Sequence, residues 1–132
     1  IPYVEKHYRA SDRRTLIGQS LAGLLATQIL LEKPQLFTEY VIVDPSLWWN
    51  KQALLQSAPD ALKKNKAAVR KVYLSAAGEP GVMKETAERL VAEIKQLRPD
   101  ITCFYEYLPS ETHATSLHIS LYNAMRLLNK PR

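Results

Sequence analysis

Residues 14–32, RTLIGQSLAGLLATQILLE, decide the fold, because a short β-prone segment passes through Gly18 into a long apolar segment. The first four of these residues are predicted to form a strand that stops at the glycine. Residues 21–32 are strong helix formers and are apolar on nearly every side, so we expect a helix that is buried on more than one side. Lys33-Pro34 ends that helix, and the stretch predicts one strand–turn–helix unit.

The rest of the chain repeats this unit three times. Strands are predicted at residues 40–43, 69–76 and 101–108, and helices at 50–64, 82–97 and 114–129, with a short helix within residues 1–9. Strands that alternate with helices of this length pair in parallel through right-handed crossovers. An unbroken apolar strand such as YVIV suits a sheet that is covered on both faces. We therefore expect an α/β fold with a mostly parallel sheet of about four strands flanked by helices.

Length and composition limit the function classes. A chain of 132 residues with 46% apolar residues is one domain, residues 1–132. No apolar run approaches the roughly 20 residues of a membrane span. The single cysteine, Cys103, excludes an intrachain disulfide framework and a multi-cysteine zinc site. The net charge of +5 comes from short basic groups without interleaved aromatic residues, so we expect no nucleic-acid partner.

Candidate reactive side chains follow each predicted strand. Ser20 follows the first strand, Asp44 the second, Glu79 the third and His113 the fourth. Ligands of open α/β sheets bind beyond the carboxyl ends of the strands, so these side chains are expected at one edge. The order serine, acid, histidine is the chain order of hydrolases that carry a nucleophile elbow.

The segment from Gly18 to Ala22 has the pattern of such an elbow. The serine of an elbow lies on a tight, strained turn, so the residues two positions before and after it must be small. Ala22 departs from the usual glycine but is small enough to be tolerated. The backbone N–H of Leu21, at the start of the helix, is placed to donate to an oxyanion. The other interpretation of Ser20 is a simple helix cap.

The partners of the serine follow from their positions. His113 precedes the last helix in a loop, whereas the other two histidines lie before the first strand and inside the last helix, so His113 is the predicted base. Glu79 is the first candidate for the acid that orients the histidine, and Asp44 is the alternative. Glu111 is interpreted as a charged residue on the surface. A dyad of serine and histidine without an acid also remains open.

Two tryptophans, Trp48 and Trp49, follow the second strand by a few residues. Their side chains have two interpretations. They pack in the core or in a lid, or they form the walls of a site for an apolar or aromatic substrate. Together with Gln19, which precedes the serine, they are the candidate substrate-binding residues.

Four segments carry a resemblance to a known family: IPYVEKHYR, LIGQSLAGLLATQILLEKPQLFTEYVIVDPSLWWN, VYLSAAGEP and ETHATSLHISLYNAMRLL. They resemble the putative-esterase group of α/β-hydrolases, which includes the enterochelin (trilactone siderophore) esterases. The resemblance implies ester hydrolysis through an acyl-enzyme, with Ser20 as nucleophile, His113 as base and Glu79 as acid, and it implies no metal or organic cofactor. Asp44 stands where relatives often have a serine. The implied substrate is a small-molecule ester, siderophore-like or short acyl.

The resemblance covers the C-terminal half of the family's fold, whose first strands precede the elbow. We therefore expect these residues to be a fragment that lacks the N-terminal strands, with an exposed apolar edge at its first strand and a homodimer formed through that edge. The second oxyanion donor comes from a loop after an early strand, so weak activity is expected. The alternative function is a non-catalytic α/β-hydrolase-like fragment that binds a ligand or partner.

Overall fold

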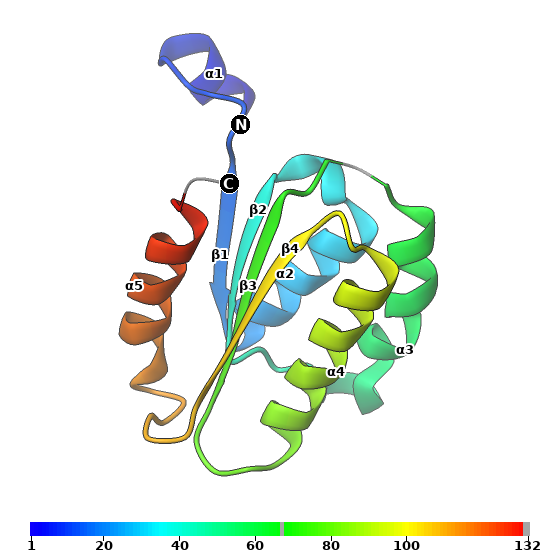
Figure 1. Cartoon of the computed structure of the whole chain (residues 1–132). Helices are drawn as coiled ribbons and strands as arrows, with labels where there is room; N and C mark the ends of the chain where they lie inside the picture. Colours follow the sequence, from blue (N-terminus) through cyan, green and yellow to red (C-terminus); the bar gives the residue numbers. More distant parts are fainter. Residues whose placement is uncertain (67, 131–132) are drawn as a thin grey trace.

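The computed structural model describes residues 1–66 and 68–130 (Figure 1). Its four parallel strands are β1 (Thr15–Gln19), β2 (Glu39–Val43), β3 (Lys71–Ala77) and β4 (Thr102–Leu108), and they form one sheet in the order β1-β2-β3-β4. The helices are α1 (Pro2–His7), α2 (Leu21–Glu32), α3 (Trp49–Lys64), α4 (Val82–Leu97) and α5 (Ser116–Leu128), with a short 3-10 turn η1 (Pro34–Leu36). The predicted α/β fold with a parallel four-stranded sheet is confirmed.

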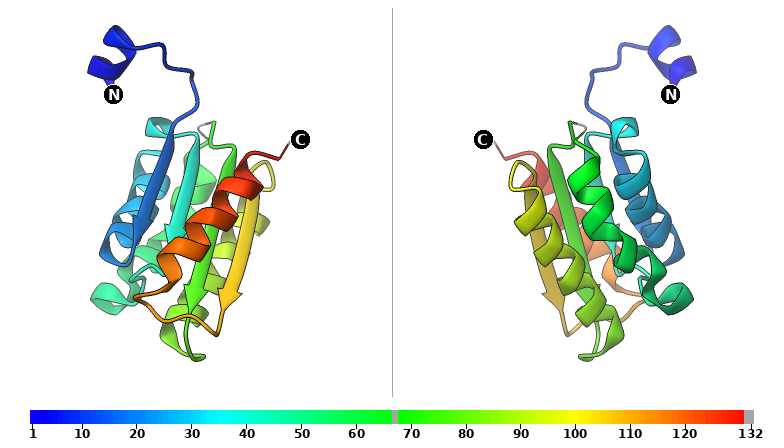
Figure 2. Two further views of the ribbon diagram at one scale, coloured as in Figure 1. Left: turned by 90° about the vertical axis from the view of Figure 1, so that its left-hand side faces the viewer. Right: turned by 90° about the vertical axis from the view of Figure 1, so that its right-hand side faces the viewer.

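Helices cover both faces of the sheet. α2, α3 and α4 lie on one face and α5 lies on the other (Figure 2). The larger apolar core lies beneath the three helices, and a smaller cluster of Val41, Val43 and Tyr73 packs against Ala124 and Leu128 of α5. All five residues of β2 are buried, which is the burial expected of an apolar central strand.

The register of the strands brings their carboxyl ends to one edge. Gln19 of β1 pairs with Val43 of β2, and Val43 pairs with Ser75 of β3. The residues that directly follow β1 and β2 therefore start side by side. Since the strands run in parallel, the loops after β3 and β4 lie at the same edge (Figure 1).

β1 lies at the edge of the sheet, and apolar side chains are exposed on and beside it. Among the described residues β1 pairs with β2 alone. Ile17 is 40% exposed on this strand, and Leu21 and Leu25 of the adjoining α2 are 65% and 55% exposed. The short helix α1 stands apart from the layers (Figure 1) and is joined to them by an ion pair between Glu5 and Arg14. The homodimer through this edge stays a prediction.

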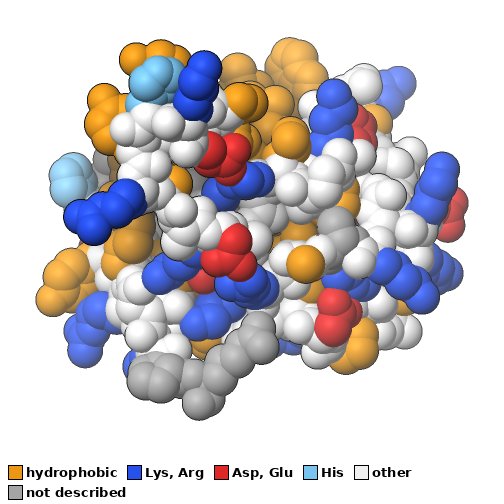
Figure 3. Space-filling model, turned by 90° about the horizontal axis from the view of Figure 1, so that it is seen from above, with side chains coloured by type: hydrophobic (Ala, Val, Ile, Leu, Met, Phe, Trp, Pro, Cys, Tyr) orange, Lys and Arg blue, Asp and Glu red, His pale blue; other side chains and the backbone are white. Residues whose placement is uncertain are grey.

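Many Lys and Arg side chains lie on the face of the molecule where the strands begin (Figure 3). Several of them pair with carboxylates there, such as Arg13 with Glu39 at 2.8 Å and Arg98 with Asp100 at 2.7 Å. The hydrogen bond from Arg98 lowers the pKa of Asp100. No helix in the described part of the chain is both long and apolar enough to cross a membrane.

Candidate active site

The turn from β1 to α2 holds Ser20 in a strained backbone conformation, with φ of 57° and ψ of −118°. The N–H of Ser20 donates to the carbonyl of Val43 at 3.0 Å, which ties the turn to the end of β2. A Cβ atom on Gly18 would lie 2.2 Å from the carbonyl oxygen of Ala22. The turn can therefore form only with glycine at this position, which is the physical reason for the first small residue of an elbow.

The alanine at position 22 is accommodated because it lies on the exposed side of α2. The close approach occurs one residue later, where a Cβ atom on the buried Gly23 would lie 3.0 Å from Cβ of Pro45. Gly23 lets the start of α2 pack against the loop that follows β2. The departure from the G-x-S-x-G pattern thus falls at a position where a methyl group has room.

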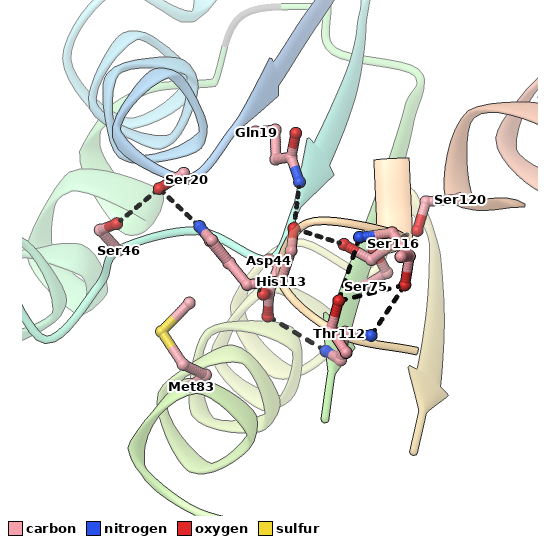
Figure 4. A network of polar contacts seen from close by, with 12 residues as sticks. Gln19, Ser20, Asp44, Ser46, Ser75, Met83, Thr112, His113, Ser116 and Ser120 are labelled. Carbon is pink, nitrogen blue, oxygen red and sulfur yellow. Dashed lines mark hydrogen bonds and ion pairs between the residues drawn. The ribbon is translucent and has the colours of Figure 1, made fainter. Parts of the chain in front are cut away.

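His113 lies between Ser20 and Asp44 (Figure 4). Its Nε2 is 2.9 Å from Oγ of Ser20, and its Nδ1 is 2.5 Å from Oδ2 of Asp44. A carboxylate accepts hydrogen bonds, so Nδ1–H donates to Asp44 and Nε2 is left to accept from the serine hydroxyl. The three side chains thus form the arrangement of nucleophile, base and orienting carboxylate that is typical of acyl transfer.

The Asp44 carboxylate is buried but is well satisfied. Its side chain is 2% exposed. Oδ1 accepts the N–H of Ala77 at 3.1 Å, while Oδ2 accepts from His113. The backbone of Asp44 takes a positive φ of 42°, and its N–H donates to Ser75 at 2.9 Å. These contacts aim the carboxylate at the imidazole and offset the cost of burying it.

Glu79, which ranks first as the acid on sequence grounds, lies elsewhere. It lines the cavity at the exposed turn after β3 and, among the described residues, makes no hydrogen bond to His113. Two features explain the difference. β2 adjoins β1 whereas β3 is one strand farther away, and Gly78 turns the chain with a φ of 81° before Glu79 is reached. The carboxyl group that meets the histidine is that of Asp44.

A cavity of about 620 Å³ opens over Ser20 and His113. Its wall includes the side chains of Asp44, Ser46, Trp48, Glu79, Met83, Pro109, Glu111 and Thr112. Of the candidate substrate-binding residues, Trp48 lies on this wall. Trp49 instead lines a separate hollow against α2 with Leu24 and Gln28. Gln19 is absent from the wall, and its amide donates to the carbonyl of His113 at 2.7 Å.

One further residue beside the nucleophile was not singled out from the sequence. Oγ of Ser46 lies 3.3 Å from Oγ of Ser20, and the N–H of Ser46 donates to the Ser20 carbonyl at 3.1 Å. Its position two residues after Asp44, at the same sheet edge, is the sequence signal that could have indicated it. Leu21 is the first residue of α2, so its N–H has no partner within the helix and is available to an oxyanion. Within the described residues no group of three His, Cys, Asp or Glu side chains could hold a metal ion.

Comparison with known proteins places the chain in a family. The model of the family described as "Putative esterase" matches residues 1–95, so the chain belongs to that family, as its resemblance predicts. The ferri-bacillibactin esterase BesA of Bacillus subtilis is 30% identical to it over 140 residues, which cover 98% of this chain and 48% of that protein. The chain thus spans about half the length of this relative.

Two solved structures have the same fold. The BES protein from Bacillus cereus superimposes with a TM-score of 0.87 at 27% identity, covering 98% of this chain and 52% of that one. An IroE-like serine hydrolase from Shewanella oneidensis gives a TM-score of 0.81 at 26% identity, covering 96% of this chain and 43% of that one.

Proposed function

We propose that the chain hydrolyses carboxylic esters through an acyl-enzyme formed on Ser20. The observation that carries the proposal is the pair of contacts made by one imidazole, Nε2 to Ser20 at 2.9 Å and Nδ1 to Asp44 at 2.5 Å. A base in reach of the hydroxyl and oriented by a third group is the signature of an activated nucleophile. Membership of the "Putative esterase" family supports the same reaction.

The first half of the reaction transfers the acyl group. Oγ of Ser20 attacks the ester carbonyl carbon while its proton passes to Nε2 of His113, and the carbonyl oxygen becomes an oxyanion. The N–H of Leu21, at the positive end of α2, donates to that oxyanion. The C–O bond to the alcohol then breaks, and His113 returns the proton to the leaving oxygen. The products are the free alcohol and an ester on Ser20.

The second half releases the acid. Water attacks the carbonyl carbon of the acyl-enzyme and loses its proton to Nε2 of His113. The bond to Oγ breaks, His113 returns the proton to Ser20, and the carboxylic acid leaves. In both halves Asp44 keeps the proton on Nδ1 and stabilises the imidazolium that forms, because its carboxylate is held by the N–H of Ala77.

The proposed substrates are siderophore-like or short acyl esters. Trp48, Met83 and Pro109 supply apolar surface to the cavity beside the polar reacting groups, which suits an ester with an apolar or aromatic portion. The relative from Bacillus subtilis is named a ferri-bacillibactin esterase, and that name supports the siderophore class.

Covalent labelling tests the proposal most directly. A fluorophosphonate reacts quickly only with an activated serine, so we expect mass spectrometry to find the label on Ser20 and to find none in Ser20→Ala. Hydrolysis of p-nitrophenyl acetate and butyrate should be lost in the same variant. Ser57→Ala, which removes an exposed hydroxyl on α3, is the matched control. An unlabelled Ser20 with no Ser20-dependent hydrolysis would contradict the proposal and favour a non-catalytic, ligand-binding chain.

A further inference from the structure

The loop that carries His113 differs from the rest of the site in how it is held. Residues 109–115 connect β4 to α5, and all of them except Glu111 are exposed. Several hydrogen bonds of this loop stay within it, namely those among Thr112, Thr115 and Glu111. The imidazole must nevertheless stay within reach of Ser20, so some contact with the sheet has to restrain the loop.

The imidazole itself contacts Asp44 and Ser20, and the backbone of the loop is tied to the sheet by Gln19. Its Nε2 donates to the backbone carbonyl of His113 at 2.7 Å. Within the described residues it is the one hydrogen bond that the loop's backbone makes to any residue before Leu108. The hydroxyl of Ser116, the first residue of α5, also reaches this carbonyl, but at the longer distance of 3.4 Å.

The position of Gln19 on β1 explains how the contact arises. Gln19 pairs in register with Val43, whose side chain packs beneath α5. Side chains alternate along a strand, so Gln19 faces the α5 side while its neighbour Gly18 faces α2. The last side chain of β1 on that face therefore meets the loop that leads into α5. Gln19 also lies outside the cavity wall, so the substrate and Gln19 meet different sides of the histidine.

We infer that Gln19 is a positioning residue for the base, an inference that rests on the proposed function. Its amide couples the residue before the nucleophile to the backbone of the histidine, 94 positions later. The end of β1 thus positions both the hydroxyl of Ser20 and the backbone carbonyl of His113. Loss of the amide donor lets the loop drift, and the 2.9 Å contact between Nε2 and Oγ is then formed for a smaller fraction of the time.

Three substitutions at position 19 test the inference. Gln19→Met keeps the length and removes the donor, Gln19→Glu keeps the shape and replaces the donor with an acceptor, and Gln19→Lys keeps a donor of similar reach. We expect the first two to slow phosphonate labelling of Ser20 about three- to tenfold, the size of one lost hydrogen bond, and the lysine variant to recover most of the rate. For p-nitrophenyl butyrate, kcat falls with labelling while KM stays unchanged, because Gln19 does not line the cavity.

The control is Gln28→Met, which removes a surface glutamine amide on α2 that bonds Glu32 and should change neither rate. Thermal unfolding of each variant separates positioning from loss of fold, and the methionine and glutamate variants serve as alternatives if one fails to fold. Three outcomes would overturn the inference about Gln19 and leave the proposed function standing. They are wild-type labelling rates in both donor-free variants, a raised KM with unchanged kcat, and a loss in the lysine variant equal to that in the other two. A wild-type Ser20 that reacts no faster than Ser57 would instead overturn the proposed function itself.

Discussion

The two parts of the candidate site are held in different ways. Ser20 and Asp44 directly follow adjacent strands, and their backbone N–H groups donate to Val43 and Ser75, which end β2 and lie in β3. His113 lies in an exposed loop and is held by side-chain hydrogen bonds to Ser20, Asp44 and Gln19. The geometry of the nucleophile and the carboxylate is thus a property of the sheet, whereas the geometry of the base depends on a few contacts. Changes to the turns that hold Ser20 and Asp44 should affect fold and reaction together, whereas changes to the contacts of the loop, that of Gln19 included, should affect the reaction alone.

The largest effect is expected at the carboxylate that links the two parts. Asp44→Asn keeps the shape of the side chain but presents an amide to Nδ1, which favours the wrong tautomer of His113, and it should lower kcat about 10³- to 10⁴-fold. Rates of p-nitrophenyl butyrate hydrolysis measure it. Glu79→Gln is the matched control on the cavity wall and should change kcat by less than about twofold, because no hydrogen bond joins Glu79 to His113 in the described structure. A larger loss in Glu79→Gln than in Asp44→Asn would reverse the assignment of the acid.

The next largest effect is expected in the turn from β1 to α2, which carries Ser20. Gly18→Ala places a Cβ atom 2.2 Å from the Ala22 carbonyl oxygen, so we expect a loss of about 3 kcal/mol in the free energy of unfolding together with loss of Ser20 labelling. Urea denaturation measures the stability. Gly81→Ala provides the comparison, because a Cβ atom there would meet nothing closer than 4.0 Å and the residue has an extended φ of 171°. Equal stabilities of the two variants would show that the turn tolerates a side chain.

Cys103 on β4 reports on the sheet without touching the site. Burial raises the pKa of its thiol to about 11, so at pH 8 nearly all of it is the unreactive protonated form. We expect iodoacetamide to modify the native chain at least about tenfold more slowly than a short peptide with the same thiol. Gly18→Ala should speed this modification by opening the sheet, and Gln19→Met should leave it unchanged because only the loop is released. Faster modification in Gln19→Met would show that the loop and the sheet are not separate units.

The smallest effect is expected at Ser46. Its hydroxyl lies 3.3 Å from the Ser20 hydroxyl, which is long for a hydrogen bond between two hydroxyl groups. Ser46→Ala should therefore lower the phosphonate labelling rate of Ser20 by less than about threefold, and the unfolding midpoint should not change. A loss as large as that of Asp44→Asn would make Ser46 part of the proton path.

Much of this architecture was determined by the sequence alone. The apolar runs and the turn residues between them predict the four strands and five α-helices of the described residues but not the 3-10 turn η1, and residues 21–32 and 82–97 form helices with the predicted bounds. The candidates Ser20 and His113 also follow from sequence, because parallel strands deliver the residues after them to one edge whatever the details of packing.

Only the tertiary structure decided which side chains meet at that edge. Asp44 contacts His113 because β2 adjoins β1 and because Asp44 takes a positive φ, while Gly78 turns the chain before Glu79. Gln19 turns to the α5 face and restrains the histidine loop, and the two adjacent tryptophans line different hollows. Strand neighbours and backbone angles depend on contacts between residues far apart in the chain, so a local pattern predicts which residues reach the edge but not their orientation there.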